Sequence, residues 1–159
     1  MEPGFSEIIP VKLTHIDSRG QASMVDVSHK PVVLREALAR GEIRLQKATI
    51  ALIQSNQIAK GNVLATARIA GIQAAKKTGE LIPLCHPLPI THCGVDFEIP
   101  KTRDRIVISA SAKIAAQTGI EMEALTAVAV AALTIYDMCK AVDKAMTIGE
   151  IRVTAKVKE

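Results

Sequence analysis

The stretch from Ala124 to Tyr136 contains no ionised side chain and consists almost entirely of small and aliphatic residues. It is well short of the roughly 20 apolar residues that a helix needs to cross a bilayer, so we expect no membrane span. A helix that is apolar on most sides is instead buried in a protein interior. Thr118 and Glu121 match a capping box, which predicts that this helix starts there and runs to about Val142. We expect a sheet to cover one of its faces, and a second copy of the chain is a candidate cover for another.

The chain can hold one domain, and its core must be built without large rings. It has 159 residues and a mass of 17.0 kDa, with 48% hydrophobic residues, as expected for a single folded domain. Aromatic residues make up only 2%, so alanine, valine, isoleucine and leucine must fill the core. The apolar area buried per residue is then limited, and association of subunits would supplement it.

Hydrophobic periodicity predicts an alternation of strands and helices along the chain. We expect strands over residues 32–45, 95–99, 105–114 and 148–157. We expect helices over residues 47–57, 63–77 and 118–142. This order predicts an α+β fold of the ferredoxin-like type, with an antiparallel or mixed sheet and helices packed on one face. An extended N-terminal arm, residues 1–20, should precede the single catalytic domain, residues 21–159.

The boundaries of these elements rest on a few residues. Residues 32–45 fit a helix almost as well as the strand that we assign. Asn62 is placed to cap the helix of residues 63–77, and Gly79 is placed to stop it. The turn at residues 101–104 joins the two strands of a β-hairpin.

The segment from Leu84 to Cys93 contains two Cys-His pairs and cannot be helical, because of its prolines. Cys85, His86, His92 and Cys93 are all acceptable zinc ligands, so a zinc hydrolase is one interpretation. Neighbours in an extended segment point to opposite sides, which argues against a shared ion and favours buried cysteines. His86, held beside Pro87, could serve as a general acid or a phosphate donor, and a purely structural histidine is equally compatible with the sequence.

Charged residues begin abruptly where the apolar run ends. Asp137, Lys140 and Lys144 would share one helical face, as an ordinary surface salt bridge would also place them. If Asp137 is partly desolvated it needs a partner, and desolvation would lower the pKa of Lys140 towards neutrality, as suits a base. Lys60 lies just before the predicted helix of residues 63–77, whose free N–H groups could bind an anion.

Charge and cysteine content restrict the setting and the partners. The net charge is +4 and the pI about 9.1, which favours anionic partners such as phosphates. Three cysteines, an odd number, and an N-terminus without a secretory pattern predict a cytoplasmic protein. A nucleotide- or RNA-binding module is an alternative function, but the strands offer only Phe97 for base stacking. We expect neither a nucleic-acid partner nor a membrane partner.

Three strings together resemble one enzyme family. They are LTHIDSRGQASMVDVS, KGNVLATARIAGIQAAKKTGELIPLCHPL and TGIEMEALTAVAVAALTIYDMCKAVDK. In this order they are similar to the cyclic pyranopterin monophosphate synthases, the molybdenum cofactor biosynthesis protein C family, and the resemblance runs from about Leu13 to Lys156. It implies a lyase that converts a cyclised dihydro-GTP intermediate into cyclic pyranopterin monophosphate and releases diphosphate.

The resemblance also implies roles for individual residues. The catalytic residues it implies are Asp137, Lys140, Lys60 and His86. The residues it implies for substrate binding are Leu84, Cys85, His86, Met122, Glu123, Glu121, Arg35 and Lys156. No metal ligand and no resident cofactor is implied, and magnesium could accompany the triphosphate.

One geometric constraint favours sites shared between subunits. Glu123 and Asp137 lie on one predicted helix, about 21 Å apart at the usual helical rise. A small pocket cannot easily contact both, but two antiparallel copies of the helix would bring Glu123 of one protomer near Asp137 of the other. The family's assembly, a hexamer built as a trimer of dimers, is consistent with this arrangement.

Overall fold

The computed structural model describes residues 14–159, which form one layer of helices on one antiparallel sheet. The strands are β1 (Val33–Arg44), β2 (His92–Glu98), β3 (Arg105–Ala116) and β4 (Thr147–Lys158). The helices are α1 (Lys47–Gln54), α2 (Val63–Lys76), α3 (Thr78–Leu81) and α4 (Glu121–Cys139). The spatial order of the strands is β2-β3-β1-β4, and every neighbouring pair is antiparallel.

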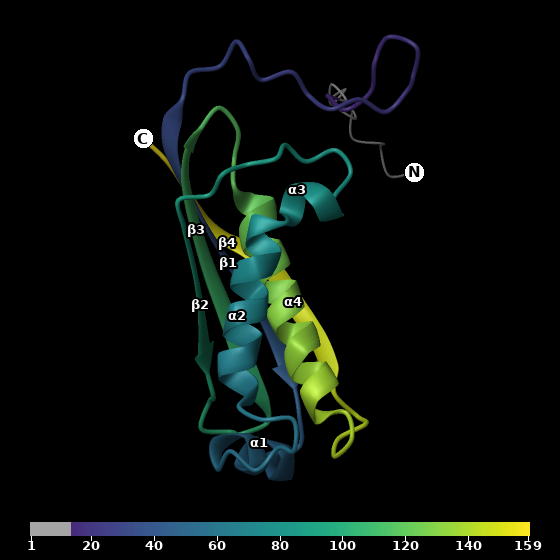
Figure 1. Ribbon diagram of the computed structural model, residues 1–159, viewed down its shortest axis with the longest axis vertical. Helices are drawn as coiled ribbons and strands as arrows, with labels where there is room; N and C mark the ends of the chain where they lie inside the picture. Colours follow the sequence, from purple (N-terminus) through teal and green to yellow (C-terminus); the bar gives the residue numbers. More distant parts are fainter. Residues whose placement is uncertain (1–13) are drawn as a thin grey trace, which may run out of the picture.

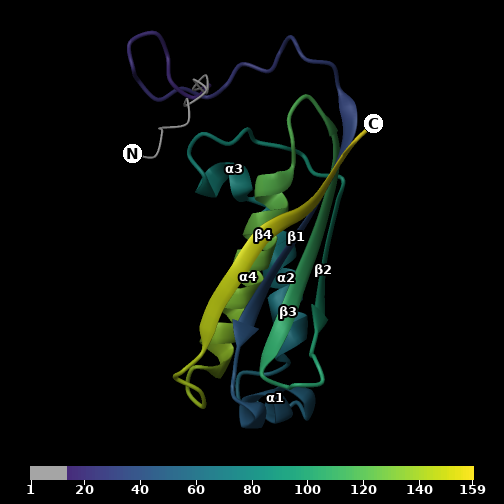
Figure 2. The same cartoon turned by 180° about the vertical axis from the view of Figure 1, so that it is seen from behind.

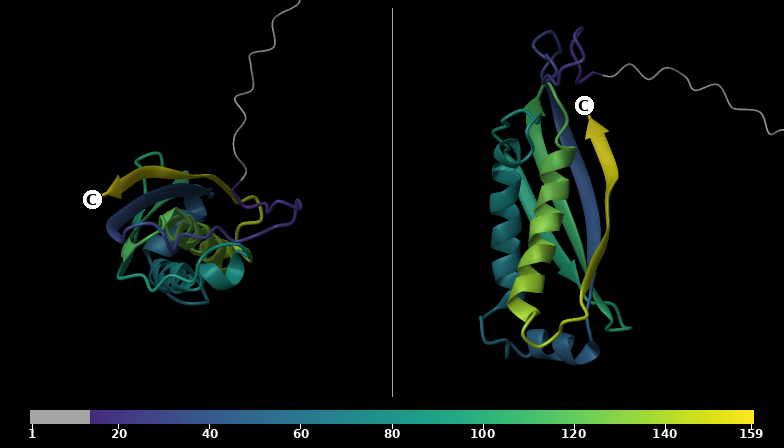
Figure 3. Two further views of the ribbon diagram at one scale, coloured as in Figure 1. Left: turned by 90° about the horizontal axis from the view of Figure 1, so that it is seen from above. Right: turned by 90° about the vertical axis from the view of Figure 1, so that its right-hand side faces the viewer.

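The helices α2 and α4 lie side by side on the same face of the sheet (Figure 1), as the view from the side also shows (Figure 3). Seen from behind, the other face of the sheet carries no helix in the described chain (Figure 2). The predicted α+β fold of the ferredoxin-like type is therefore confirmed, with a sheet that is antiparallel throughout.

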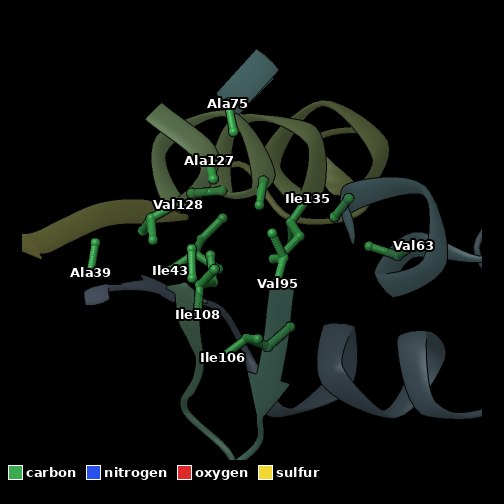
Figure 4. Packing of buried hydrophobic residues seen from close by; sticks show 14 of the residues in the cluster. Ala39, Ile43, Val63, Ala75, Val95, Ile106, Ile108, Ala127, Val128 and Ile135 are labelled. Carbon is green, nitrogen blue, oxygen red and sulfur yellow. The ribbon is translucent and has the colours of Figure 1, made fainter. Parts of the chain in front are cut away.

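Alternation along the strands builds the core from aliphatic side chains. Ala37, Ala39, Gly41 and Ile43 of β1 are buried, while the residues that alternate with them are more exposed. Figure 4 shows Ile43 and Val95 of the sheet facing α4. In the described chain α4 alone is long and apolar enough to cross a membrane, yet more than half of it is buried inside the domain. It is the core helix that its sequence predicts.

Two helix boundaries differ from those predicted. The helix α4 begins at Glu121, with Ile120 as its N-cap residue and no side-chain cap, so the capping box is wrong. The Glu121 carboxylate forms an ion pair with Lys156 of β4, 3.0 Å between Oε1 and Nζ. The helix also ends at Cys139 and does not reach Val142.

The helix α2 agrees with expectation at its start and differs at its end. The Asn62 side chain accepts a hydrogen bond from the N–H of Ala65 at 2.9 Å, which confirms the predicted cap. Gly79 does not stop the helix, because α2 ends at Lys76 and Gly79 lies inside the short helix α3.

The predicted arm lies partly outside the described residues, since the description begins at Thr14. From there the chain forms a turn in which Asp17 Oδ1 accepts hydrogen bonds from the N–H groups of Arg19 and Gln21, both 2.9 Å long. The chain then crosses the end of the sandwich to reach β1 (Figure 1).

Gly71 allows α2 and α4 to approach backbone to backbone. A Cβ atom at this position would lie 2.8 Å from the carbonyl oxygen of Ala127 in α4. Gly71→Ala must push the helices apart, so we expect the free energy of unfolding to fall by about 1–3 kcal/mol. Urea titration followed by circular dichroism measures this change. Gln73→Ala, on the exposed side of α2, should stay within about 0.5 kcal/mol of wild type, and equal midpoints for the two variants would contradict the close packing.

Candidate active site

The predicted site residues form two clusters at opposite ends of α4. Asp137 and Lys140 lie at its C-terminal end, where Lys60 approaches from the segment before α2. Glu121, Met122 and the buried Glu123 lie at its N-terminal end. The two ends of α4 are separated by nearly its full length (Figure 1), so one chain does not bring all the predicted residues together.

The first cluster is a carboxylate held between two ammonium groups. Lys60 Nζ lies 2.8 Å from Asp137 Oδ2 and 3.0 Å from the carbonyl oxygen of Asp137. Lys140 Nζ lies 2.7 Å from Asp137 Oδ1. Each oxygen of the Asp137 carboxylate therefore faces an ammonium group, and one of the two groups, that of Lys60, comes from a distant part of the sequence.

The electrostatics of this cluster differ from the prediction for Lys140. Hydrogen bonds and charge from Lys140 and Lys60 lower the pKa of Asp137 to about 2. The hydrogen bond with Asp137 and its negative charge raise the pKa of Lys140. The side chains of Asp137 and Lys140 are each 57% exposed, so the expected desolvation of both groups is wrong for a single chain. Within the single chain, Lys140 holds its proton as a potential acid.

Lys144 does not join this cluster, although its spacing placed it on the same helical face. The helix ends at Cys139, so Lys144 follows the helix and forms no ion pair with the residues that the structure describes.

The second cluster surrounds a pocket of about 530 Å³. Predicted residues that line it are Leu84, Cys85, His86, Glu121, Met122 and Glu123. The segment after α3 supplies the first three, and the first turn of α4 supplies the others. This part of the predicted substrate site is therefore brought together within one chain.

A main-chain contact fixes the His86 ring in this pocket. Its Nε2 lies 2.8 Å from the carbonyl oxygen of Val25. A carbonyl oxygen can only accept a hydrogen bond, so Nε2 carries the hydrogen and donates. The other ring nitrogen, Nδ1, makes no hydrogen bond with the described residues.

Glu123 is the buried acid of this cluster, with only 3% of its surface exposed. Burial raises the pKa of its carboxyl group, and the negative charge of Glu121 adds to the effect. The pKa of Cys85 is raised as well, by burial and by the charge of Glu123. The neutral forms of Glu123 and Cys85 are favoured as a result.

The raised pKa of Glu123 predicts a pH-dependent stability. The folded chain binds this proton more tightly than the unfolded chain does, so stability is lost as pH rises above the ordinary pKa of 4.5. Glu123→Gln cannot ionise, so we expect its melting temperature to exceed that of wild type by about 2–4 °C at about pH 8. The difference should vanish at about pH 4. Glu80→Gln, exposed in α3, should follow wild type at both values, and a pH-independent gain for Glu123→Gln would contradict this origin.

Arg35 and Lys156 lie beside the N-terminal end of α4, near Glu121. Arg35 donates from Nε to the carbonyl oxygen of Ala116 and from Nη2 to that of Gln117, both at 3.2 Å. Burial alone would raise the pKa of Glu121, but hydrogen bonds, including one from Lys156, and the charges of Lys156 and Arg35 lower it. An incoming phosphate would compete with Glu121 for Lys156.

The structure supports neither the zinc hydrolase nor the RNA-binding module as an alternative function. Within residues 14–159, no group of three or more histidine, cysteine or acidic side chains could hold a metal ion, so Cys85, His86, His92 and Cys93 do not form the zinc site considered above. His92 and Cys93 belong to β2, whose alternation sends them to opposite faces. The ring of Phe97 is half-buried, with the Arg68 guanidinium 5.5 Å from its centroid, so it is not free to stack on bases.

Sequence reasoning missed the residues that the N-terminal segment brings to the pocket. These lining residues are Thr14, His15, Val25, Val27 and Lys30. All but Lys30 lie in the first of the three strings that carry the family resemblance. The family resemblance of that string could have pointed to these residues, but no local sequence pattern predicts that the segment folds back over a pocket.

Comparisons with known proteins agree with the resemblance. A family model described as the MoaC family matches residues 24–158. A protein of Parvibaculum lavamentivorans is 57% identical over 145 residues, which are 91% of each chain. A protein of Clostridium perfringens is 55% identical over 146 residues, 92% of each chain, and one of Chloroflexus aurantiacus is 56% identical over 145 residues, 91% of this chain and 89% of the other. All three relatives are named cyclic pyranopterin monophosphate synthase.

Proposed function

The chain belongs to the MoaC family, and from this premise we propose that it is an enzyme of molybdenum cofactor biosynthesis that forms cyclic pyranopterin monophosphate. In this proposal it is a lyase that acts on a cyclised dihydro-GTP intermediate and releases diphosphate. The observation that carries the proposal is the Asp137 carboxylate held at 2.7 Å and 2.8 Å between the ammonium groups of Lys140 and Lys60. Such a cluster can store and move protons beside an anionic substrate.

The residues divide the work by charge and position. Lys140 and Asp137 move protons as the purine-derived ring opens and the new rings close. Lys60, Lys156 and Arg35 hold the triphosphate and neutralise the charge that develops on the departing diphosphate.

The pocket at the other end of α4 would hold the ring system. Cys85, Leu84 and Met122 supply its apolar contacts, and Glu121 and Glu123 can accept hydrogen bonds from ring N–H groups. His86, fixed through Nε2, offers Nδ1 to the substrate. We propose no resident cofactor, and magnesium would enter only with the triphosphate.

The length of α4 supports a site made from two protomers. It spans about 27 Å, which separates the pocket from the Asp137 cluster by more than the size of the substrate. The helix α4 exposes Met122 at its N-terminal end and Leu133 in its C-terminal half, with 38% and 58% of their surface accessible. An antiparallel copy of α4 would cover these side chains and place the pocket of one protomer beside the Asp137 cluster of the other. We propose that such dimers associate further into a hexamer in the cytoplasm.

Diphosphate release from the cyclised dihydro-GTP intermediate tests the proposed reaction. Purified protein treated with a chelator, and assayed with and without added magnesium, should release diphosphate, and Asp137→Ala should not. Release that appears only with added magnesium would mean that the ion enters with the triphosphate. A wild-type protein that binds the intermediate tightly and releases nothing under either condition would overturn the lyase assignment.

A further inference from the structure

Among residues 14–159, the most deeply buried acid outside the two clusters is Asp143, with 1% of its surface exposed. It lies in the connection between α4 and β4, three positions after Lys140. A buried carboxylate is costly unless it is well hydrogen-bonded, so its partners show what it stabilises.

Three donors surround the Asp143 carboxylate. Oδ2 accepts hydrogen bonds from the N–H of Gln46 at 2.9 Å and from the Thr49 hydroxyl at 3.0 Å. Oδ1 accepts one from the N–H of Ala145 at 3.1 Å. Burial alone would raise the pKa of Asp143, but these hydrogen bonds outweigh it and lower the pKa, so the group stays charged at neutral pH.

Two of these donors belong to the beginning of α1. Gln46 is the N-cap residue of α1, and its own side chain makes no capping hydrogen bond. The first turn of α1 also contains no acidic residue that would favour the helix dipole. Asp143 therefore supplies, from a remote part of the sequence, the negative cap that the sequence of α1 lacks.

On its other side, Asp143 is fixed to the end of α4. Its N–H donates to the carbonyl oxygen of Cys139 at 3.0 Å, next to Lys140, whose own N–H donates to Tyr136 at 2.9 Å. The helix α1 lies below the ends of α2 and α4 (Figure 1). From α1 the chain leads directly into the segment that carries Lys60.

We propose that Asp143 is a positioning residue that clamps the beginning of α1 to the end of α4 and so holds Lys60 and Lys140 on opposite sides of Asp137. This inference rests on the proposed function, because it assigns Asp143 a role through the lysines of that site. The clamp acts at the end of α4 that carries the proton-transfer groups, away from the ring pocket.

Asp143→Asn tests the clamp while keeping the size of the side chain. One of its oxygens is replaced by an N–H₂ group that faces N–H and O–H donors, so α1 should shift. We expect kcat at saturating substrate to fall about tenfold to a hundredfold, as small displacements of reacting groups do. Thr49→Ser should retain wild-type turnover, Thr49→Val should lose part of it, and Asp143→Asn/Thr49→Val should be no slower than Asp143→Asn alone.

Lysine reactivity gives a readout that does not depend on turnover. Acylation with a succinimidyl ester, followed by mass spectrometry, reports how freely each ammonium group reacts. In Asp143→Asn, Lys60 should react several-fold faster than in wild type, because its ion pair with Asp137 is loosened. Lys76, exposed at the other end of α2, should react at an unchanged rate and serves as the internal control.

Ile114→Val distinguishes positioning from general destabilisation. Ile114 is buried in β3, so the variant should melt at a lower temperature and retain its kcat and its Lys60 labelling rate. If Asp143→Asn melts like Ile114→Val and also keeps both values, the positioning role is wrong. If Asp143→Asn does not fold, Thr49→Val carries the same test, since it removes one hydrogen bond of the three.

The outcome for Lys140→Ala separates failure of this inference from failure of the proposed function. Full turnover by Lys140→Ala would contradict the proposed active site itself, whatever the activity of Asp143→Asn. Inactive Lys140→Ala with fully active Asp143→Asn would overturn the clamp alone.

Discussion

Lys140→Ala is expected to lower kcat by about 10²–10⁴-fold, the range that a general acid or base contributes. The variant should still bind the cyclised dihydro-GTP intermediate, because the ring pocket and the cations Arg35 and Lys156 lie at the other end of α4. Pre-steady-state turnover and equilibrium binding measure the two quantities separately.

Matched lysine variants make this result specific. Lys144→Ala removes a nearby exposed lysine that lies outside the Asp137 cluster, and it should behave as wild type. Lys156→Ala should instead weaken binding by about tenfold or more, as loss of a charge-assisted hydrogen bond does, with a smaller change in kcat. The reverse pattern, with Lys140→Ala impairing binding and Lys156→Ala impairing turnover, would exchange the two roles.

Co-expression of Asp137→Ala and Glu123→Ala chains is expected to restore activity that neither chain has alone. In a mixed dimer with shared sites, one site collects both substitutions and the other collects neither. With random pairing, half of the dimers are mixed and half of their sites are intact, so about a quarter of the wild-type activity should return. The measurement is diphosphate release by the purified mixed oligomer.

A second pair of chains provides the control for this experiment. Asp137→Ala and Lys140→Ala affect the same end of α4, so every site in their mixed dimer carries one of the two substitutions. That mixture should remain inactive. If the Asp137→Ala and Glu123→Ala mixture is no more active than this control, the sites are not shared between protomers in the proposed way.

Local patterns predicted most of the fold, because the core follows directly from periodicity. Alternation separates buried from exposed residues in β1 and in β3 from Ile108 onward, and Asn62 caps α2 as its position indicates. The capping box failed because α4 begins at Glu121, after the N-cap residue Ile120, so Thr118 does not cap it, and the Glu121 carboxylate pairs with Lys156, which is remote in sequence and close in space. Rules based on neighbouring residues do not identify a partner that is remote in the sequence.

The candidate site was predictable in its residue types and not in its electrostatics. The spacing of Asp137 and Lys140 suggested their contact, but the burial of these groups depends on which surfaces cover the end of α4. The contribution of His15 and Lys30 to the pocket depends on the path of the segment before β1. Neither fact is encoded in a short window of sequence.

The position of β1 in the sheet has a consequence for how the chain folds. This strand comes first of the four along the chain and lies between β3 and β4. Neither of its pairings can therefore form until the later strands have been synthesised. Its pairing with β4 joins residues as distant as Arg35 and Lys158. Contacts of such long range slow folding, and during synthesis on the ribosome both edges of β1 stay unpaired until the later strands emerge. The nascent chain is therefore most vulnerable to aggregation over the interval in which α1, α2 and β2 are complete and the centre of the sheet is still open.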